Sequence, residues 1–256
     1  MTFIDALILG VVEGITEFLP VSSTGHLILV SKLLGLAQTE FLKTFEIIIQ
    51  LGAISAVIFL YRKTLFSKFH VMSRVAAAFG PTGVIGLLAY PLLREYVLGN
   101  EYVVVAALFI GGVILIAFEK WHKPHHVTKA AMEELSHREA ALLGAAQAVA
   151  LIPGVSRSAA TAVGGMLLGL PRAAVVEFSF LLAVPTMLAA TGFELFHSAH
   201  LFRVEQLELL VVGFLVSFVV ALASVRFLLS HIKQSTFEVY GVYRILVAIV
   251  FFVAFL

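Results

Sequence analysis

The sequence contains no cysteine. This absence excludes a thiolate nucleophile, a disulfide framework and a cysteine-based zinc site. Charged residues are also scarce, because they make up only 13% of the chain, whereas a soluble domain carries about 25%. The formal net charge is +1, so the composition gives no indication of a nucleic-acid partner.

The N-terminus lacks basic residues, since none occurs between Met1 and Asp5. A cleaved signal peptide needs a positively charged leading region, so residues 1–30 are expected to remain in the mature protein. Hydrophobic residues make up 61% of the 256 positions. The composition therefore predicts an all-α polytopic membrane protein, with residues 1–256 forming a single integral membrane domain.

The polar residues concentrate in two related stretches. Residues 13–26 read EGITEFLPVSSTGH, and residues 147–161 read QAVALIPGVSRSAAT. An ungapped shift of 134 residues superimposes them and matches glycines and hydroxyl residues in register. A fixed long offset of this kind indicates an internal repeat. The polar and glycine matches are Gly10 with Gly144, Glu13 with Gln147, Ser22 with Ser156, Thr24 with Ser158, and Gly35 with Gly169.

Each polar stretch interrupts an apolar segment that is too short to cross a bilayer as one helix of about 20 residues. The first pair of segments covers residues 4–19 and 22–36, and the second covers 138–152 and 156–169. We predict that each pair forms a re-entrant helical hairpin, whose irregular tip must be buried in protein or line a cavity. The alternative is one long kinked helix per repeat. The hairpin is favoured because both copies carry the same break.

Ordinary apolar spans separate and follow the two hairpins. We predict repeat 1 at about residues 1–118, a cytoplasmic loop at 119–137, and repeat 2 at about 138–256. Three spans lie between the hairpins, and this odd number predicts repeats of inverted topology. The six predicted spans cover residues 44–61, 75–93, 101–118, 174–195, 207–227 and 238–256.

The loop charges predict the orientation. Loops 62–74 and 119–138 contain four Lys or Arg residues each, whereas loops 94–101 and 196–206 contain one each. Loops rich in Lys and Arg are usually cytoplasmic. We therefore expect both termini and the mouth of the first hairpin outside, the mouth of the second hairpin in the cytoplasm, and the two tips near the midplane.

Two carboxylates lie on the first predicted hairpin. Glu13 and Glu17 are four residues apart, so on a helix they share one face and repel each other. Each charge at bilayer depth also costs about 2.5–3.5 kcal/mol. We expect a compensating cation, either a divalent metal such as Mg²⁺ or Ca²⁺, which prefers oxygen ligands, or Arg157. The alternative is that one glutamate is protonated and merely hydrogen-bonded.

Hydroxyl groups follow these carboxylates, at the expected start of the returning helix. Ser22, Ser23 and Thr24 could simply cap that helix, but three hydroxyls exceed this need, and a helix N-terminus also binds anions. His26 lies about one turn after Ser23, where it could accept the serine proton or protonate a leaving group. The alternative for His26 is an ordinary buried histidine.

The second tip repeats this design and adds an arginine. The guanidinium of Arg157 suits a phosphate group through its planar fork. We assign substrate binding to this residue and to its polar neighbours at both tips. Besides Arg157, the predicted substrate-binding residues are Ser22, Thr24, Gln147, Ser156, Ser158 and Thr161.

The two motifs resemble those of the undecaprenyl-pyrophosphate phosphatases, the bacitracin-resistance type of membrane phosphatase. The family motif E-x-x-x-E-F-L-P-[VI]-S-S-[TS]-G-H occurs here as residues 13–26, and P-G-x-S-R-S-x-x-T occurs as residues 153–161. The resemblance implies hydrolysis of undecaprenyl pyrophosphate to the monophosphate carrier used for peptidoglycan. It also implies bacitracin resistance, since bacitracin competes by sequestering that lipid.

The same resemblance implies roles and a location. Glu13 and Glu17 would bind a divalent cation or act in acid–base steps, Ser23 is the candidate nucleophile beside His26, and Arg157 would hold the pyrophosphate. Whether Ser23 or an activated water attacks stays open. Family members are thought to work at the outer side of the bacterial inner membrane. The sequence leaves open whether the protein forms a homodimer.

Two other functions are compatible with some of these features. A secondary transporter or carrier-lipid translocase shares the plan of inverted repeats with broken helices, and fold alone does not separate it from a phosphatase. The acid-phosphatase-like lipid phosphatases need a second histidine shortly after a Ser-Arg pair. After Ser156 and Arg157 the next histidine is His197, so this second family is rejected.

Overall fold

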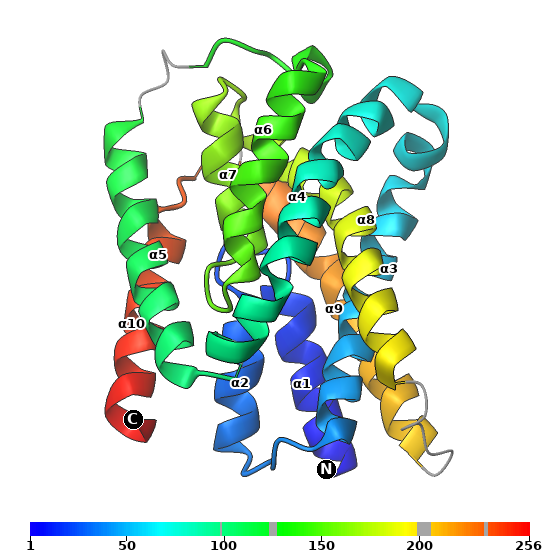
Figure 1. Ribbon diagram of the computed structural model, residues 1–256, viewed down its shortest axis with the longest axis vertical. Coiled ribbons are helices and arrows are strands. Elements are labelled where there is room, and N and C mark those ends of the chain that lie inside the picture. Colours follow the sequence, from blue (N-terminus) through cyan, green and yellow to red (C-terminus); the bar gives the residue numbers. More distant parts are fainter. Residues whose placement is uncertain (98, 123–126, 199–205, 233–234) are drawn as a thin grey trace.

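The computed structural model describes residues 1–97, 99–122, 127–198, 206–232 and 235–256. Within this part of the chain every regular element is helical (Figure 1). The elements in order are α1 (Phe3–Thr16), α2 (Ser23–Leu33), α3 (Glu40–Ser67), α4 (Phe69–Tyr96), α5 (Glu101–Trp121), η2 (Met132–Glu134), α6 (His137–Gln147), η3 (Ala148–Leu151), α7 (Arg157–Leu167), α8 (Arg172–Ser198), α9 (Leu207–His231) and α10 (Glu238–Phe255).

Six of the described helices are long and apolar enough to cross a membrane. They are α3, α4, α5, α8, α9 and α10, and their lengths in the described chain range from 18 to 28 residues. Each corresponds to one of the spans predicted from the sequence. The protein is therefore an all-α, multi-pass membrane protein, as its composition predicts.

One predicted loop is wrong. Residues 62–74 are helical except at Lys68, because α3 continues to Ser67 and α4 begins at Phe69. The backbone leaves the helical region at Tyr61 (φ −101°, ψ 15°), where the predicted span ended, but the helix resumes beyond it. Long basic side chains can extend past apolar surface to water. A charged residue therefore marks the end of an apolar span better than it marks the end of a helix.

Four short helices form two pairs that approach each other from opposite ends of the molecule. Helix α1 begins and α2 ends at the end where both termini lie, whereas α6 begins and α7 ends at the other end (Figure 1). These helices have only 11 to 14 residues each. Helix α1 packs on α9, and α6 packs on α4. The two tips, residues 17–22 and 152–156, therefore lie between the long helices.

The two helix pairs share local backbone geometry at the 134-residue offset. Among the described non-glycine residues only Ser22 (φ 73°) and Ser156 (φ 74°) have positive φ. Each serine caps the helix that follows it, and its Oγ accepts the N–H three residues on at 3.4 and 3.3 Å. Gly35 (φ 65°) and Gly169 (φ 87°) end those helices in the left-handed region that glycine tolerates. The breaks predicted from the sequence therefore share the serine cap and the glycine that ends the following helix, although a 3-10 helix, η3, precedes only the second tip.

Close helix contacts also recur at this offset. A Cβ added to Gly10 would lie 2.9 Å from the carbonyl oxygen of Gly213 on α9. A Cβ added to Gly144 would lie 1.8 Å from the carbonyl oxygen of Ala78 on α4. Small residues allow membrane helices to approach closely. These contacts hold α1 and α6 against the long helices that flank them.

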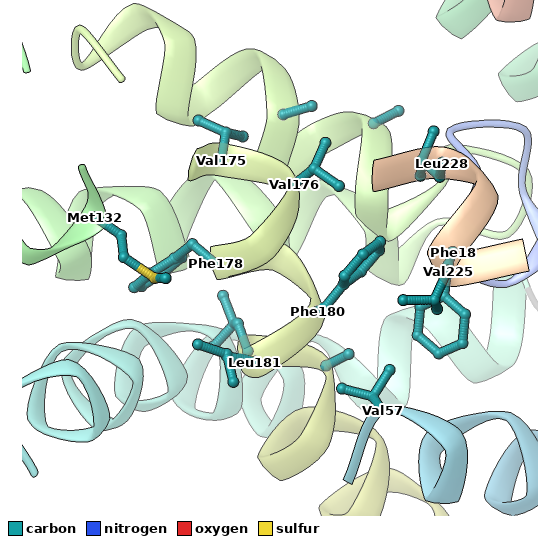
Figure 2. Packing of buried hydrophobic residues seen from close by; sticks show 14 of the residues in the cluster. Phe18, Val57, Met132, Val175, Val176, Phe178, Phe180, Leu181, Val225 and Leu228 are labelled. Atoms are coloured by element: carbon teal, nitrogen blue, oxygen red, sulfur yellow. The ribbon is translucent and has the colours of Figure 1, made fainter. Parts of the chain in front are cut away.

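The largest buried cluster of apolar side chains lies beside the first tip (Figure 2). The ring of Phe18 packs edge-to-face on Phe180 of α8, with ring centroids 5.3 Å apart and an interplanar angle of 85°. Val57 of α3 and Val225 of α9 belong to the same cluster. Because Phe18 is fully buried, its packing fixes the backbone next to Glu17.

Candidate active site

The two tips bring Glu17, Ser23 and Arg157 into direct contact. The Ser23 hydroxyl donates to Oε2 of Glu17, and Nη2 of Arg157 donates to Oε1 of the same carboxylate at 3.2 Å. Nη1 of Arg157 donates to the carbonyl of Ser179 on α8 at 2.8 Å. The Glu17 and Arg157 side chains are only 7% and 13% exposed. The ion pair is therefore buried, and it joins the α1–α2 pair to the α6–α7 pair.

Glu13 lies one helical turn before Glu17 and is fully buried. Within the described residues neither of its carboxylate oxygens has a hydrogen-bond partner. Its electrostatic interactions are repulsive with Glu17 and Glu46 and attractive with Arg157. A buried carboxylate without partners is costly unless it is protonated or compensated by a cation.

This pair of carboxylates fits a divalent cation only in part. Mg²⁺ is usually bound by one or two carboxylates together with substrate phosphates, and Glu13 and Glu17 offer such a pair. The described residues contain no group of three or more His, Cys, Asp or Glu side chains that could hold a metal ion by themselves. A bound metal would therefore need ligands from substrate or water.

The serines of the two tips are largely engaged in local structure. Ser22 and Ser156 cap α2 and α7. Ser158 donates to the carbonyl of Leu19 at 2.8 Å and lies 3.1 Å from the hydroxyl of Ser156. A second direct contact therefore joins the two tips. Thr24 is exposed, whereas the other tip hydroxyls are buried.

Gln147 and Thr161 hydrogen-bond to each other within the second helix pair. The Thr161 hydroxyl lies 3.4 Å from Oε1 of Gln147 and donates to the carbonyl of Arg157 at 2.7 Å. Nε2 of Gln147 donates to Thr82 on α4 at 3.3 Å. Gln147 occupies the position equivalent to Glu13 at the 134-residue offset. It is hydrogen-bonded, whereas Glu13 has no such partner among the described residues.

His26 hydrogen-bonds to groups other than Ser23. Its Nδ1 lies 2.7 Å from the carbonyl of Ser22, and its Nε2 lies 2.8 Å from the hydroxyl of Tyr243 on α10. The two rings stack with centroids 5.5 Å apart and an interplanar angle of 6°. In the described structure Ser23 donates to Glu17 instead. The acid–base role of His26 stays a prediction.

The sequence reasoning did not single out Tyr243, Arg244 or Ser179. Tyr243 binds His26, Ser179 accepts from Arg157, and Arg244 is a fully buried arginine that reaches both tips. A signal for Arg244 was available, because it is the only charged residue in the last span after Glu238. An ionisable residue inside a span is a functional-site candidate.

Comparisons with known proteins give one consistent result. The sequence model of the bacitracin resistance protein BacA family matches residues 6–250. The undecaprenyl-diphosphatase of Aquifex aeolicus (strain VF5) is 46% identical over 256 residues, which covers 100% of both chains. The undecaprenyl-diphosphatase of Sulfurihydrogenibium sp. (strain YO3AOP1) is 47% identical over 252 residues, covering 98% of this chain and 99% of the relative. That of Wolinella succinogenes is 47% identical over 251 residues, covering 98% and 97%.

Proposed function

The chain belongs to the bacitracin resistance protein BacA family, and from this premise we propose that it is an undecaprenyl-diphosphatase. It hydrolyses undecaprenyl pyrophosphate to undecaprenyl phosphate and inorganic phosphate. This reaction recycles the lipid carrier for peptidoglycan synthesis and confers bacitracin resistance. The observation that carries the proposal is the contact of Glu17 with both Ser23 and Arg157, in a chain whose full-length relatives are named for this activity.

The tip residues suit phosphoryl transfer, which mainly requires positioning and electrostatic stabilisation. Arg157 and the N-termini of α2 and α7 present positive charge to the pyrophosphate. Either a water or Ser23 attacks the terminal phosphorus, and the bond from this phosphorus to the bridging oxygen breaks. If Ser23 attacks, a water then hydrolyses the resulting phosphoserine, which releases inorganic phosphate and restores the hydroxyl. The bridging oxygen leaves with undecaprenyl phosphate. Glu17 is placed to accept the proton of Ser23 if this hydroxyl attacks.

A divalent cation, Mg²⁺ or Ca²⁺, is part of the proposal. Glu13 and Glu17 would hold it together with oxygens of the substrate, and it would neutralise charge on the pyrophosphate. The unpartnered, buried carboxylate of Glu13 supports this assignment. His26 would act beside Ser23, with Tyr243 and the Ser22 carbonyl holding its ring.

We propose that α1–α2 and α6–α7 are re-entrant hairpins of an inverted repeat, with their tips near the bilayer midplane. Their short lengths, their entry from opposite ends and their shared backbone shape support this. The helix junction at Lys68 and residues 127–136, which precede α6, lie at the end where α6 begins and α7 ends (Figure 1). Placing this end in the cytoplasm of the bacterial inner membrane opens the carboxylate hairpin to the periplasmic side.

The test is phosphate release from undecaprenyl pyrophosphate by purified protein in detergent, with and without EDTA. The wild type and the control Glu40→Ala, whose carboxylate is 58% exposed, should release phosphate when metal is supplied. Glu17→Ala and Arg157→Ala should lose most activity while still inserting. Equal activity in these variants would refute the site. Inactivity of an intact, metal-supplied wild type would favour a carrier-lipid translocase instead.

Bacitracin gives a second check on the substrate. Because it sequesters the lipid, the amount needed for inhibition should increase with the concentration of undecaprenyl pyrophosphate. It should not increase with the enzyme concentration. The opposite dependence would show that bacitracin binds the protein.

A further inference from the structure

Arg244 is the largest fully buried side chain among the described residues. It lies on α10, inside a candidate membrane span. Its guanidinium donates hydrogen bonds to five backbone carbonyls, and no carboxylate forms an ion pair with it in the described part of the chain. The acceptors are Pro20 (3.4 Å), Gly154 (2.9 Å), Val155 (2.9 Å), Ala107 (3.0 Å) and Leu108 (3.4 Å).

These carbonyls belong to three separate segments. Pro20 lies in the first tip, Gly154 and Val155 lie in the second tip, and the remaining two acceptors lie on α5. A single nitrogen, Nη1, donates to both Pro20 and Val155. The planar guanidinium has five N–H donors in a fixed fork, so its geometry fixes where the two tips lie relative to each other and to α5.

Glycines at the crossing of α5 and α10 leave room for the Arg244 side chain. A Cβ on Gly112 would lie 2.7 Å from the carbonyl oxygen of Gly241, and a Cβ on Gly241 would lie 2.8 Å from that of Gly112. The two helices therefore cross through glycines. A Cβ on Gly111 would lie 2.1 Å from Nη2 of Arg244. The guanidinium thus occupies the space that a side chain at position 111 would fill.

We propose that Arg244 is a positioning residue that sets the distance between the two hairpin tips and thereby the alignment of Glu17, Ser23 and Arg157. A residue that only packed α10 on α5 would not need hydrogen-bond acceptors in both tips. Arg244 acts through backbone carbonyls close to these residues in sequence. Pro20 lies between Glu17 and Ser23, and Val155 lies two residues before Arg157. Its effect on turnover rests on the proposed phosphatase function, but its effect on tip separation does not.

The first test measures turnover and KM in Arg244→Lys and Gly111→Ala. Lysine keeps the charge but lacks the fork, and alanine at position 111 displaces the guanidinium without removing it. A misplacement of about 1 Å can reduce a rate about 100-fold, so we expect kcat to fall about 100-fold in Arg244→Lys, with KM within about threefold. Gly80→Ala is the matched control, because a Cβ there meets nothing within 4 Å. If Gly111→Ala retains the activity of Gly80→Ala, the proposal is wrong.

A double-mutant comparison separates this effect from a general packing defect. If alanine at position 111 acts by displacing Arg244, it should cause no further loss of kcat in an Arg244→Met background. Losses that multiply instead would show that the glycine acts independently of the arginine. This result would overturn the proposed link between the helix crossing and the tips.

The second test reads tip separation without any substrate. The chain has no cysteine, so Pro20→Cys with Val155→Cys gives a single defined pair at two positions that share one donor nitrogen. If tip separation governs the rate, oxidation should join the pair at least about tenfold faster with Arg244 present than with Arg244→Met. Equal rates would refute the role of Arg244. An inactive wild type with this rate difference intact would refute the phosphatase function alone.

Discussion

Replacing Arg157 with methionine should destabilise the protein more than replacing Arg157 and Glu17 together. The single variant Arg157→Met leaves the Glu17 carboxylate buried, close to Glu13 and without its cation. The double variant Arg157→Met with Glu17→Gln removes both charges and keeps the side-chain volumes similar. Glu13 then loses one attraction and one repulsion.

The magnitude follows from burial. Removing one partner of a buried ion pair costs about 3–5 kcal/mol, whereas replacing both with neutral groups of similar volume is often neutral or stabilising. The Glu17–Arg157 pair qualifies, since its side chains are 7% and 13% exposed. In a protein of this size 1 kcal/mol corresponds to about 2–4 °C in Tm. We therefore expect Tm to fall by about 6–20 °C in the single variant and by only a few degrees in the double variant.

The assay is thermal unfolding in detergent, followed by circular dichroism at one fixed scan rate because unfolding of such a protein is often irreversible. Arg62→Met is the matched control, since Arg62 is exposed and bonds only its own helix among the described contacts. Its Tm should stay close to that of the wild type. A single variant as stable as the double variant would refute the reasoning, because Glu17 would then not depend on the charge of Arg157.

Three further predictions concern the second helix pair. Gly144→Ala should lower Tm strongly, because the added Cβ would lie 1.8 Å from the Ala78 carbonyl oxygen. The control Gly192→Ala should leave Tm unchanged, because a Cβ there meets nothing within 4 Å. Equal Tm values for the two variants would disprove the close contact. Ser156→Gly should unfold at a higher Tm than Ser156→Ala. Both variants lose the serine cap of α7, but only glycine suits a φ of 74°. The reverse order of Tm would contradict this backbone conformation. Hydrogen bonds from the Ser136 backbone and then the Lys129 side chain lower the pKa of Glu139, which lies outside the six candidate spans, to about 2. Its stabilising contribution should therefore be complete above pH 4.5 and decrease as the pH falls from 4.5 to about 2, and Glu139→Gln should show a weaker dependence on pH across this range.

Part of the site follows from the sequence because its residues are close along the chain. Glu13 and Glu17 share a helix face by their spacing, and Ser22 caps the next helix because a serine precedes an apolar run there. The fixed offset then pairs each tip residue with a counterpart in the second copy. The backbone conformation at Ser22 (φ 73°, ψ 96°) resembles that at Ser156 (φ 74°, ψ 114°), as expected where the same local sequence pattern specifies it.

The contacts of α10 could not be derived in this way. Tyr243 and Arg244 lie more than 200 residues from the first tip in sequence, and their partners depend on how α10 is rotated about its axis. Arg244 indicates one inward-facing position on α10, but a single charged residue does not reveal which groups the helix contacts. The hydrogen bonds of Tyr243 to His26 and of Arg244 to both tips therefore required the folded structure.

The two related stretches, residues 13–26 and 147–161, differ at the positions that carry charge. At the 134-residue offset Glu13 corresponds to Gln147, Glu17 to Leu151, and Ser23 to Arg157. The first copy therefore supplies the carboxylates and the reactive hydroxyl, and the second supplies the cation. Neither copy is electrostatically complete on its own, because two adjacent buried carboxylates repel and an isolated buried arginine is equally costly. The Glu17 and Arg157 charges are compensated only when the tips meet, so the contact that pairs these two charges also assembles the site.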